Sequence, residues 1–385
     1  MDKKILITGG GTAGHIYPAV AIIEYLKENY PDVKILFIGS KKGMEAKVIP
    51  FLSVNFQTIR ASGFSITHNI FKKIAVFARF TLNLFSGFFS SLNIIRKFKP
   101  DFILGMGGYV CGPVLLASVF LRKKIGLHEQ NFIPGRLNRF FAKFSKYIFL
   151  SFIDSKDYLM SVVKNNNSRL IFSGNPVRKS IKNFESLKPQ YDKWQLEANR
   201  FTIVSFGGSL GAEKLNNSVT GLYNYLRNDD RIQILLISGE RFYKALNDRL
   251  LHMRKSGDRI IFKLFSFIKD MEHVYRIADL IISRAGATTI AELIATKIPA
   301  ILVPYPDAVE NHQFYNAKYL EGSGKAIIVS DDIICAEELF NQIKKLFADS
   351  FKSYIQMKEK KIEMENINAS EIISGTILNL MQPKN

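Results

Sequence analysis

The sequence has little cysteine, and its two residues, Cys111 and Cys335, stand far apart among 385. Two distant cysteines exclude a disulfide framework and a C-x-x-C metal site, so we expect a protein of the reducing cytosol. The pattern of a signal peptide is also missing, because the first residues run directly into an apolar segment typical of a β-strand.

Acidic residues are scarce as well. The chain carries 34 Asp and Glu against 53 Lys and Arg, a formal charge of +19. Such a surplus indicates an anionic partner: a nucleic acid, an acidic lipid surface or a phosphorylated substrate. Because no motif combines basic and aromatic residues in the way that nucleic-acid recognition requires, we do not expect a nucleic-acid partner.

Uninterrupted apolar runs long enough to span a membrane are missing too. Residues 71–99 have the length, but Arg79 and several polar residues interrupt them, and a charge in mid-span costs about 3 kcal/mol. Phenylalanines recur there at roughly helical spacing, at Phe77, Phe80, Phe85, Phe88 and Phe89. Basic residues flank them, at Lys72, Lys73, Arg96, Lys97 and Lys99. The pattern predicts one or two helices lying on an anionic membrane surface, with ordinary core helices as the alternative.

Apolar, β-rich segments alternate with helical patterns along the chain, which predicts an α/β fold with parallel sheets covered on both faces. The opening design of strand, glycine turn and long helix begins again at residue 200. We therefore predict two doubly wound, Rossmann-like domains, 1–175 and 176–354, and a C-terminal helix at about 355–385 that packs back on the first. In such sheets ligands bind beyond the carboxyl ends of the strands, so two facing domains would form an interdomain cleft.

The segment GGGTAGH, residues 9–15, satisfies the dinucleotide pattern G-x-G-x-x-G. A nicotinamide site also needs an acidic residue at the end of the second strand, where this chain has Gly39 and Ser40, followed by two lysines. The lysines would suit NADP, so an NADP-dependent oxidoreductase stays a candidate. The segment is not a P-loop, because no Gly-Lys-Ser/Thr follows.

Two further glycine turns follow predicted strands, GMGGYVCGP at 105–113 and FGGSLGA at 206–212. Glycines at such turns let backbone N–H groups approach an anion at a helix N-terminus. Three turns of this kind indicate more than one phosphate-bearing ligand.

Seven segments resemble a known family, in family order: GGGTAGHIYPA, GMGGYVCGP, HEQN, GNPVR, GGSLGA, SRAGATTIAEL and NHQFYNA. From residue 4 to about 325 the chain closely resembles the MurG family of peptidoglycan N-acetylglucosaminyltransferases. The resemblance implies a GT-B fold and an inverting transfer of GlcNAc from UDP-GlcNAc to the 4-hydroxyl of MurNAc in lipid I (undecaprenyl-pyrophosphoryl-MurNAc-pentapeptide), giving lipid II. It implies no metal or other cofactor and a peripheral position at the cytoplasmic face of the inner membrane. Partners among the proteins of cell-wall synthesis and division stay open.

The donor site is expected mainly in the second half. The turn in SRAGATT would present the N–H groups of Ala287, Thr288 and Thr289 to a diphosphate. The resemblance gives Glu292 to the ribose hydroxyls, although a carboxylate complementing the helix dipole is the alternative. It further implies Ser209 as a phosphate contact, Ile268 beside the uracil, Arg178 for the nucleotide, Asn131 and Gln313 for sugar hydroxyls, and Thr12, Ala13 and Gly14 facing the donor.

His15 stands directly behind the first glycine loop. Histidine titrates near neutrality, which suits a general base for the acceptor hydroxyl. The position equally suits binding of the acceptor's pyrophosphate, together with Gly11, Gly14, Gly107, Gly108 and Tyr109, and the sequence leaves the two roles open. Glu129 is the other candidate base, with an internal carboxylate as its alternative, and the neighbouring His128 is expected to be structural.

The chain departs from the family pattern at Cys111, where serine is common, and at Leu210, where glutamine is common. Both changes put in doubt only the side-chain contacts at those positions. Three competing functions remain: another GT-B glycosyltransferase that acts on a membrane lipid, the NADP-dependent oxidoreductase, and a non-catalytic anion-binding protein.

Overall fold

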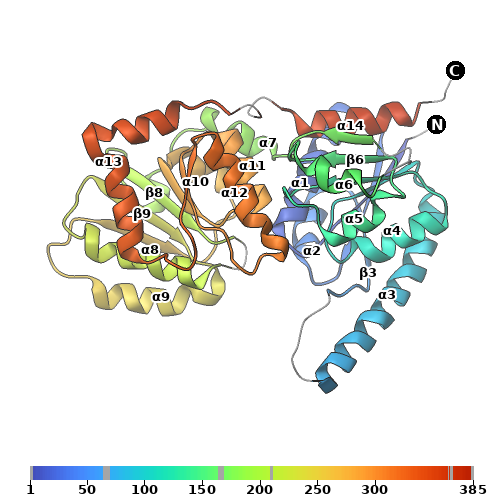
Figure 1. The fold of residues 1–385 in the computed structure, drawn as a ribbon, viewed down its shortest axis with the longest axis horizontal. Helices are drawn as coiled ribbons and strands as arrows, with labels where there is room; N and C mark the ends of the chain where they lie inside the picture. Colours follow the sequence, from blue (N-terminus) through green and yellow to red (C-terminus); the bar gives the residue numbers. More distant parts are fainter. Residues whose placement is uncertain are drawn as a thin grey trace. The chain divides into compact units, whose positions relative to one another are not determined.

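A computed structural model describes residues 3–63, 70–163, 169–208, 211–362, 364 and 367–382. The chain forms two compact units: Met1–Arg178 with Ile367–Asn385 make unit 1, and Lys179–Asn366 make unit 2 (Figure 1). Each unit is a parallel α/β sheet with helices packed against it. The chain leaves unit 2 at Asn366, later than the expected limit at 354.

Unit 1 contains a seven-stranded parallel sheet with the strand order β3-β2-β1-β4-β5-β6-β7. Its strands are β1 (Lys4–Thr8), β2 (Lys34–Ser40), β3 (Asn55–Ile59), β4 (Phe102–Gly105), β5 (Ile125–Glu129), β6 (Tyr147–Leu150) and β7 (Arg169–Phe172). The central strands are buried along nearly their whole length. A strand covered on both faces needs apolar side chains on both, which explains the continuous apolar runs in the sequence.

Seven helices and a 3₁₀ turn accompany this sheet in the described part of unit 1: α1 (Ala13–Asn29), α2 (Met44–Val48), η1 (Ile49–Leu52), α3 (Ile70–Phe98), α4 (Cys111–Phe120), α5 (Arg136–Ala142), α6 (Ser155–Met160) and α14 (Ala369–Leu380). The C-terminal helix α14 returns from unit 2 to pack beside α1 (Figure 1). Its Ile373 and Ile377 are fully buried in the same apolar cluster as Ile16 and Ile23 of α1. The last helix therefore completes the core of the first unit.

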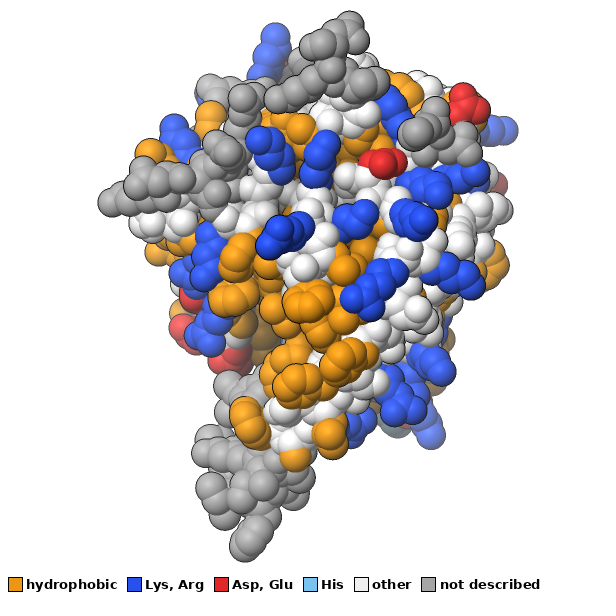
Figure 2. All heavy atoms as spheres, turned by 90° about the vertical axis from the view of Figure 1, so that its right-hand side faces the viewer, with side chains coloured by type: hydrophobic (Ala, Val, Ile, Leu, Met, Phe, Trp, Pro, Cys, Tyr) orange, Lys and Arg blue, Asp and Glu red, His pale blue; other side chains and the backbone are white. Residues whose placement is uncertain are grey.

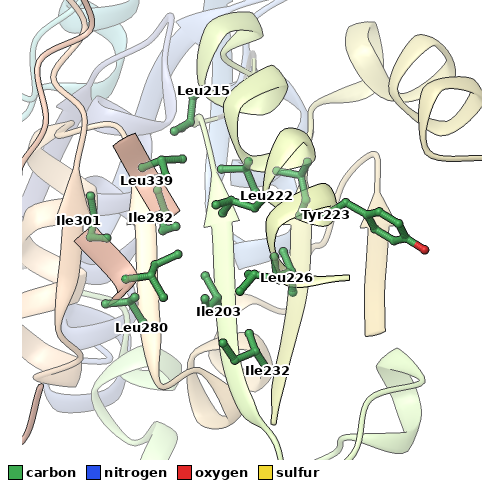
Figure 3. Packing of buried hydrophobic residues seen from close by; sticks show 14 of the residues in the cluster. Ile203, Leu215, Leu222, Tyr223, Leu226, Ile232, Leu280, Ile282, Ile301 and Leu339 are labelled. Atoms are coloured by element: carbon green, nitrogen blue, oxygen red, sulfur yellow. The ribbon is translucent and has the colours of Figure 1, made fainter. Parts of the chain in front are cut away.

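Unit 2 repeats the design with a six-stranded parallel sheet in the order β10-β9-β8-β11-β12-β13. Its strands are β8 (Phe201–Phe206), β9 (Ile232–Ile237), β10 (Ile261–Phe265), β11 (Leu280–Ser283), β12 (Ala300–Leu302) and β13 (Ala326–Ile328). Ile203 and Ile282, on one face of the sheet, belong to a buried cluster (Figure 3). The same cluster contains Leu222, from the helix that follows β8, and Leu339. This cluster is the main apolar core of unit 2.

The helical segments of unit 2 are α7 (Lys179–Lys182), η2 (Phe184–Ser186), η3 (Asp192–Trp194), α8 (Glu213–Leu226), α9 (Glu240–Met253), α10 (Met271–Ile277), α11 (Ala287–Thr296), η4 (Val309–Asn311), α12 (His312–Gly322) and α13 (Ala336–Glu359). Helix α13 is kinked at residues 348–351, where the backbone leaves helical geometry. Both α13 and α8 pack on the cluster drawn in Figure 3.

Each sheet has a point where the strand order reverses. In unit 1 the chain starts at β1, adds β2 and β3 on one side, and then places β4 on the other side of β1. In unit 2 the same reversal lies between β8 and β11. Ligands of open parallel sheets bind beyond the carboxyl ends of the strands at such a reversal. The glycine turns after β1, β4 and β8 and the small-residue turn after β11 all stand at these two points.

Candidate functional site

The turns after β1 and β4 lie against each other in unit 1. Gly108 has a φ of +83°, and a Cβ added to it would stand 2.0 Å from the carbonyl oxygen of Gly10. A side chain at this position would therefore clash with backbone and strain its own conformation. The glycines of the second turn permit close contact between two loops as well as an approach to a ligand.

His15 lies on the first turn of α1, and its ring packs on the second glycine turn. A Cβ at Gly107 would stand 2.9 Å from both Cε1 and Nδ1 of the imidazole. His15 Nδ1 is 3.2 Å from Oε1 of Gln130, which follows β5. The Gln130 amide nitrogen donates to the Met106 carbonyl at 2.7 Å and contacts His128 Nδ1 at 3.0 Å. The ends of β1, β4 and β5 thus meet around one histidine.

Glu129 is buried and its carboxylate is held on both oxygens. Oε1 accepts from the Asn131 backbone N–H at 2.9 Å, and Oε2 accepts from the Gly135 N–H at 2.9 Å and from Asn138 Nδ2 at 2.8 Å. Burial raises the pKa of the Glu129 carboxyl above its ordinary value, and these hydrogen bonds oppose the rise. The contacts favour the alternative interpretation, an internal carboxylate that shapes the loop after β5 and with it the position of Asn131.

Glu45 is a functional candidate that sequence reasoning missed. It lies on α2, five residues beyond the end of β2, and its side chain is fully buried. Its Oε1 accepts from the Ser40 N–H at 2.9 Å and the Ser40 hydroxyl at 2.6 Å, and Oε2 accepts from the Gly11 N–H at 3.3 Å. An acidic residue does therefore reach the first glycine loop, but it is turned inward as a partner of the loop itself. The only hint in the sequence was an acid slightly beyond the expected position.

Cys111, the departure from the family pattern after β4, is fully buried. Its sulfur lies 3.1 Å from the carbonyl oxygen of Thr8 and 3.0 Å from that of Gly107, and its single S–H proton is shared between these two acceptors. Burial raises the pKa of Cys111 to about 12, so the group stays a thiol. The thiol can therefore donate a hydrogen bond to the backbone here, as a serine hydroxyl would. The other departure, Leu210, and the predicted phosphate ligand Ser209 lie outside the described residues.

In unit 2 the predicted diphosphate residues stand at the N-terminus of α11. Ala287 is buried, Thr288 and Thr289 are half-buried, and the N-cap residue, Gly286, has no side chain. Glu292 lies one turn further on, and its Oε2 accepts a hydrogen bond of 2.8 Å from the hydroxyl of Tyr275 on α10. The helix end has the N–H groups and dipole that attract a phosphate, beside an oriented carboxylate.

The other donor-site candidates have definite surroundings. Gln313, at the start of α12, accepts from the Tyr305 N–H at 3.0 Å through its amide oxygen. Ile268, in the loop after β10, is buried, as a core residue would be. Arg178 is the last residue of the first segment of unit 1. The central carbon of its guanidinium lies 4.1 Å from the centre of the Tyr17 ring. Thr12 caps α1 by position and is exposed, and Ala13 and Gly14 follow it, half-buried.

An ion pair between a buried arginine and a half-buried aspartate, which the sequence did not reveal, holds the turn after β11. Arg284 Nη1 is 2.5 Å from Oδ1 of Asp331, in the loop after β13, and it also donates to the Val303 carbonyl at 3.1 Å. This guanidinium therefore links the turns that follow β11, β12 and β13 immediately before the N-terminus of α11. The described residues contain no group of three or more His, Cys, Asp or Glu that could hold a metal ion.

Residues 70–98 form one long helix, α3, with an exposed apolar side. Phe77 is 61% exposed, Phe85 59% and Phe89 63%. Phe88 differs, because it packs on the buried core of unit 1 and against the ring of Phe120. Figure 2 shows a band of hydrophobic side chains on this face of the unit, with many Lys and Arg and few acidic side chains around it.

We call Phe77, Leu82, Phe85, Phe89 and the neighbouring Phe120, all more than half exposed, the α3 face. Phe80 is half-buried, whereas the side chains of Lys72 and Lys73 lie outside the described residues. Within the part of the chain that the structure describes, no helix is both long enough and apolar enough to cross a membrane.

Comparison with known proteins identifies the family. Residues 5–150 match the glycosyltransferase family 28 N-terminal domain, and residues 202–371 match the C-terminal domain of the same family. The UDP-N-acetylglucosamine–N-acetylmuramyl-(pentapeptide) pyrophosphoryl-undecaprenol N-acetylglucosamine transferase of Desulforamulus reducens is 36% identical over 97% of both chains. The chain belongs to the MurG family. The corresponding transferase of Natranaerobius thermophilus is 36% identical over 90% of this chain and 91% of its own.

Solved structures agree with this assignment. The crystal structure of MurG from Acinetobacter baumannii has a TM-score of 0.69 and 25% identity, with 98% of this chain and 99% of that chain covered. The predicted MurG family, the GT-B fold and the enzyme class, an N-acetylglucosaminyltransferase, are therefore confirmed. Two competing hypotheses, an NADP-dependent oxidoreductase and a non-catalytic anion-binding protein, are no longer supported, because this family consists of glycosyltransferases.

Proposed function

We propose that this MurG-family enzyme transfers GlcNAc from UDP-GlcNAc to the 4-hydroxyl of MurNAc in lipid I, with inversion, and so makes lipid II for peptidoglycan synthesis. The observation that carries the proposal is the 36% identity to the Desulforamulus reducens transferase over 97% of both chains. Each of the two sheets has one reversal of strand order, where ligands of such sheets bind, so the chain offers one place for the donor and one for the acceptor.

The donor's diphosphate is proposed to bind at the N-terminus of α11, on the N–H groups of Ala287, Thr288 and Thr289. Glu292, held by Tyr275, would accept hydrogen bonds from the ribose hydroxyls. Ile268 would contact the uracil, and Ser209 would contact a phosphate. Because the amide oxygen of Gln313 already accepts from Tyr305, its NH₂ group is the part that suits a sugar hydroxyl. Arg178, Asn131, Thr12, Ala13 and Gly14 complete the proposed donor set.

The acceptor's pyrophosphate is proposed to bind the glycine turns of unit 1, at Gly11, Gly14, Gly107, Gly108 and Tyr109. The N-terminus of α1 supplies a favourable dipole there. Glu45 already accepts from the N–H of Gly11, so that amide would contribute less than its neighbours. During transfer the 4-hydroxyl oxygen bonds to the anomeric carbon, the bond to UDP breaks, and the hydroxyl proton needs a base. His15 and Glu129 are the candidates for that base, and His15 also for a pyrophosphate ligand.

The α3 face is proposed to rest on the anionic cytoplasmic surface of the inner membrane, where the polyprenyl tail of lipid I is embedded. Exposed phenylalanines beside Lys and Arg favour this kind of surface, since apolar burial and attraction to acidic lipids add together. Binding would be peripheral. Proteins of cell-wall synthesis and division are proposed as further partners, and nucleic acid is not.

A transfer assay tests the proposal. Full-length protein is incubated with radiolabelled UDP-GlcNAc and a lipid I analogue in detergent or vesicles, and label in the lipid product is counted. Label in lipid II supports the proposal; the absence of transfer by folded, vesicle-supplied protein contradicts it. Thermal melts give a second reading, in which UDP raises the melting temperature and NADPH does not. An analogue that lacks the muramyl sugar separates this function from transfer to another membrane lipid.

A further inference from the structure

We propose that Gln130 is a positioning residue that fixes neutral His15 as the Nδ1-protonated tautomer, so that the lone pair of its ring is on Nε2. This inference deepens the proposed function and rests on it for the reaction, whereas the tautomer is a property of the protein alone. It bears on the open choice for His15. A neutral ring with its lone pair on Nε2 accepts a proton from a hydroxyl there, but it cannot donate from that atom to a phosphate oxygen.

The orientation of the Gln130 amide is dictated by two backbone carbonyls. The first is Met106 O, which lies 2.7 Å from Gln130 Nε2. A carbonyl oxygen can only accept, so the NH₂ end of the amide must face it. The amide oxygen is then the atom 3.2 Å from His15 Nδ1, and an amide oxygen requires a donor. The proton of the neutral ring is therefore on Nδ1.

The second carbonyl, that of Gly174, independently leads to the same orientation of the Gln130 amide. Gly174 O lies 3.3 Å from His128 Nε2, so that nitrogen carries the proton of His128. Burial lowers the pKa of His128 to about 4, which keeps the ring neutral near pH 7 and leaves Nδ1 as an acceptor. Nδ1 lies 3.0 Å from Gln130 Nε2 and accepts its second proton. Ser151 Oγ also lies 3.5 Å from His128 Nε2, but the serine proton goes to Glu129 O at 2.8 Å. The directions of the hydrogen bonds from His15 to Gln130, His128 and Gly174 are thus assigned.

Burial makes this arrangement rigid. Gln130 is 1% exposed and His128 is fully buried, so water does not offer the amide another partner. Turning the amide over would place its oxygen against two buried acceptors, Met106 O and His128 Nδ1, and leave both without a donor, which is costly in a protein interior. Two further titratable groups of the described residues lie at this loop: Glu45 accepts from the Gly11 N–H, and the Tyr109 ring lies 3.1 Å from the place that a Cβ on Gly11 would take. The amide of Gln130 is neutral, so it orients His15 without adding charge.

The tautomer is tested by long-range ¹H–¹⁵N correlation spectra of full-length protein labelled at histidine nitrogen. The His15 signals are assigned by comparison with His15→Asn. We expect the neutral His15 ring to show its proton on Nδ1, the reverse of the form that free histidine prefers in water. A proton on Nε2 overturns the proposal. The measurement needs no substrate, so its result stands even if the transfer assay fails.

Kinetics of two variants test the role in the reaction. In Gln130→Met the orienting acceptor is lost, and we expect kcat to fall roughly 10²-fold while the KM for UDP-GlcNAc changes less than about twofold. In Gln130→Glu a carboxylate replaces the acceptor, and we expect the acidic limb of the pH–rate profile to move to higher pH, because an adjacent anion favours protonated His15. An unchanged kcat in Gln130→Met, or an unmoved limb in active Gln130→Glu, overturns the proposal.

Gln233 provides the matched control. It is also fully buried, and its amide bonds Glu197 O at 2.7 Å and Thr202 Oγ1 at 2.8 Å, in unit 2. Gln233→Glu introduces the same buried carboxylate away from His15, so it should lower stability without moving the pH–rate profile. A matching shift in this control would show that the effect in Gln130→Glu is structural, and that result also overturns the proposal. If the Gln130 variants do not fold, the ¹H–¹⁵N spectrum of the wild-type protein still tests whether the His15 proton is on Nδ1.

Discussion

The hydroxyl of Tyr275 lies 2.8 Å from Oε2 of Glu292, and both side chains are buried between α10 and α11. The hydroxyl donates and the carboxylate accepts, so the bond fixes one oxygen of the only carboxylate proposed to bind the ribose. The tyrosine is thereby a second example, after Gln130, of a buried group that orients a proposed site residue.

Tyr275→Phe removes this donor while keeping the ring. A hydrogen bond to a charged group contributes about 1.5–3 kcal/mol, so we expect lower stability and a roughly tenfold rise in the KM for UDP-GlcNAc. Melting temperature and steady-state kinetics measure the two effects. Tyr354→Phe is the control, because that hydroxyl also bonds within unit 2, to Asp279 O at 3.1 Å. Equal KM values in the two variants would contradict an orienting role for Tyr275.

Stability is expected to fall in mild acid because His128 is buried as a neutral ring. Its pKa is about 4 in the folded protein, below the ordinary value of 6.5. A lowered histidine pKa means that the unfolded chain binds the proton more readily, so the stabilisation is complete above about pH 6.5 and is lost as pH falls towards 4. Between pH 7 and pH 5 the loss should be about 2 kcal/mol.

Denaturant titrations of wild type and His128→Gln at both pH values measure this loss. The glutamine does not titrate, so its stability should change less over the same interval. The buried carboxyl of Glu129, whose pKa is raised, acts in the opposite direction in acid and is common to both proteins. An identical pH dependence in the two proteins would show that His128 is not the group responsible.

Serine at Phe77, Phe85 and Phe89 together should weaken binding to vesicles of acidic phospholipid roughly 10²-fold or more, since each buried phenylalanine contributes about 1.5–3 kcal/mol. Because these side chains are more than half exposed, the melting temperature should change little. Sedimentation with vesicles measures the binding. Phe88→Ser should instead lower stability, because Phe88 packs on the core. Leu251→Ser, an equally exposed apolar residue of unit 2, is the control that should leave vesicle binding unchanged.

Gly108→Ala should lower the free energy of unfolding by about 3 kcal/mol or more and abolish transfer, because the added Cβ would stand 2.0 Å from the Gly10 carbonyl oxygen. Gly257→Ala separates the two causes. Gly257 has a similar φ, +90°, but nothing lies within 4 Å of the added atom. It should therefore show only the backbone strain, about 1–2 kcal/mol, and keep its activity. Melting temperatures and the transfer assay measure both, and equal losses would contradict the importance of the loop contact.

Most of the sheets could be predicted from the sequence, but β3, β7 and β13 were not. All three are edge strands, which pair on one side only. β3 is half-exposed, and β13 has three residues. β3 has no continuous apolar run, and the runs in β7 and β13 are only three residues long, so these sequences do not stand out from loops. The strands in the centre of each sheet are covered on both faces, and their apolar runs predicted them.

The sequence by itself determined the family, the two doubly wound sheets and the glycine turns at their reversal points, because periodicity and motif order are local properties of a chain. It did not determine which phenylalanines of α3 face outward, that Glu45 turns back to the first loop, or that Gln130 orients His15. Those relations join residues far apart in sequence whose strands end at one edge of a sheet. A hydrogen bond has a direction only when both partners are in place, and here the carbonyls of Met106 and Gly174 set that direction.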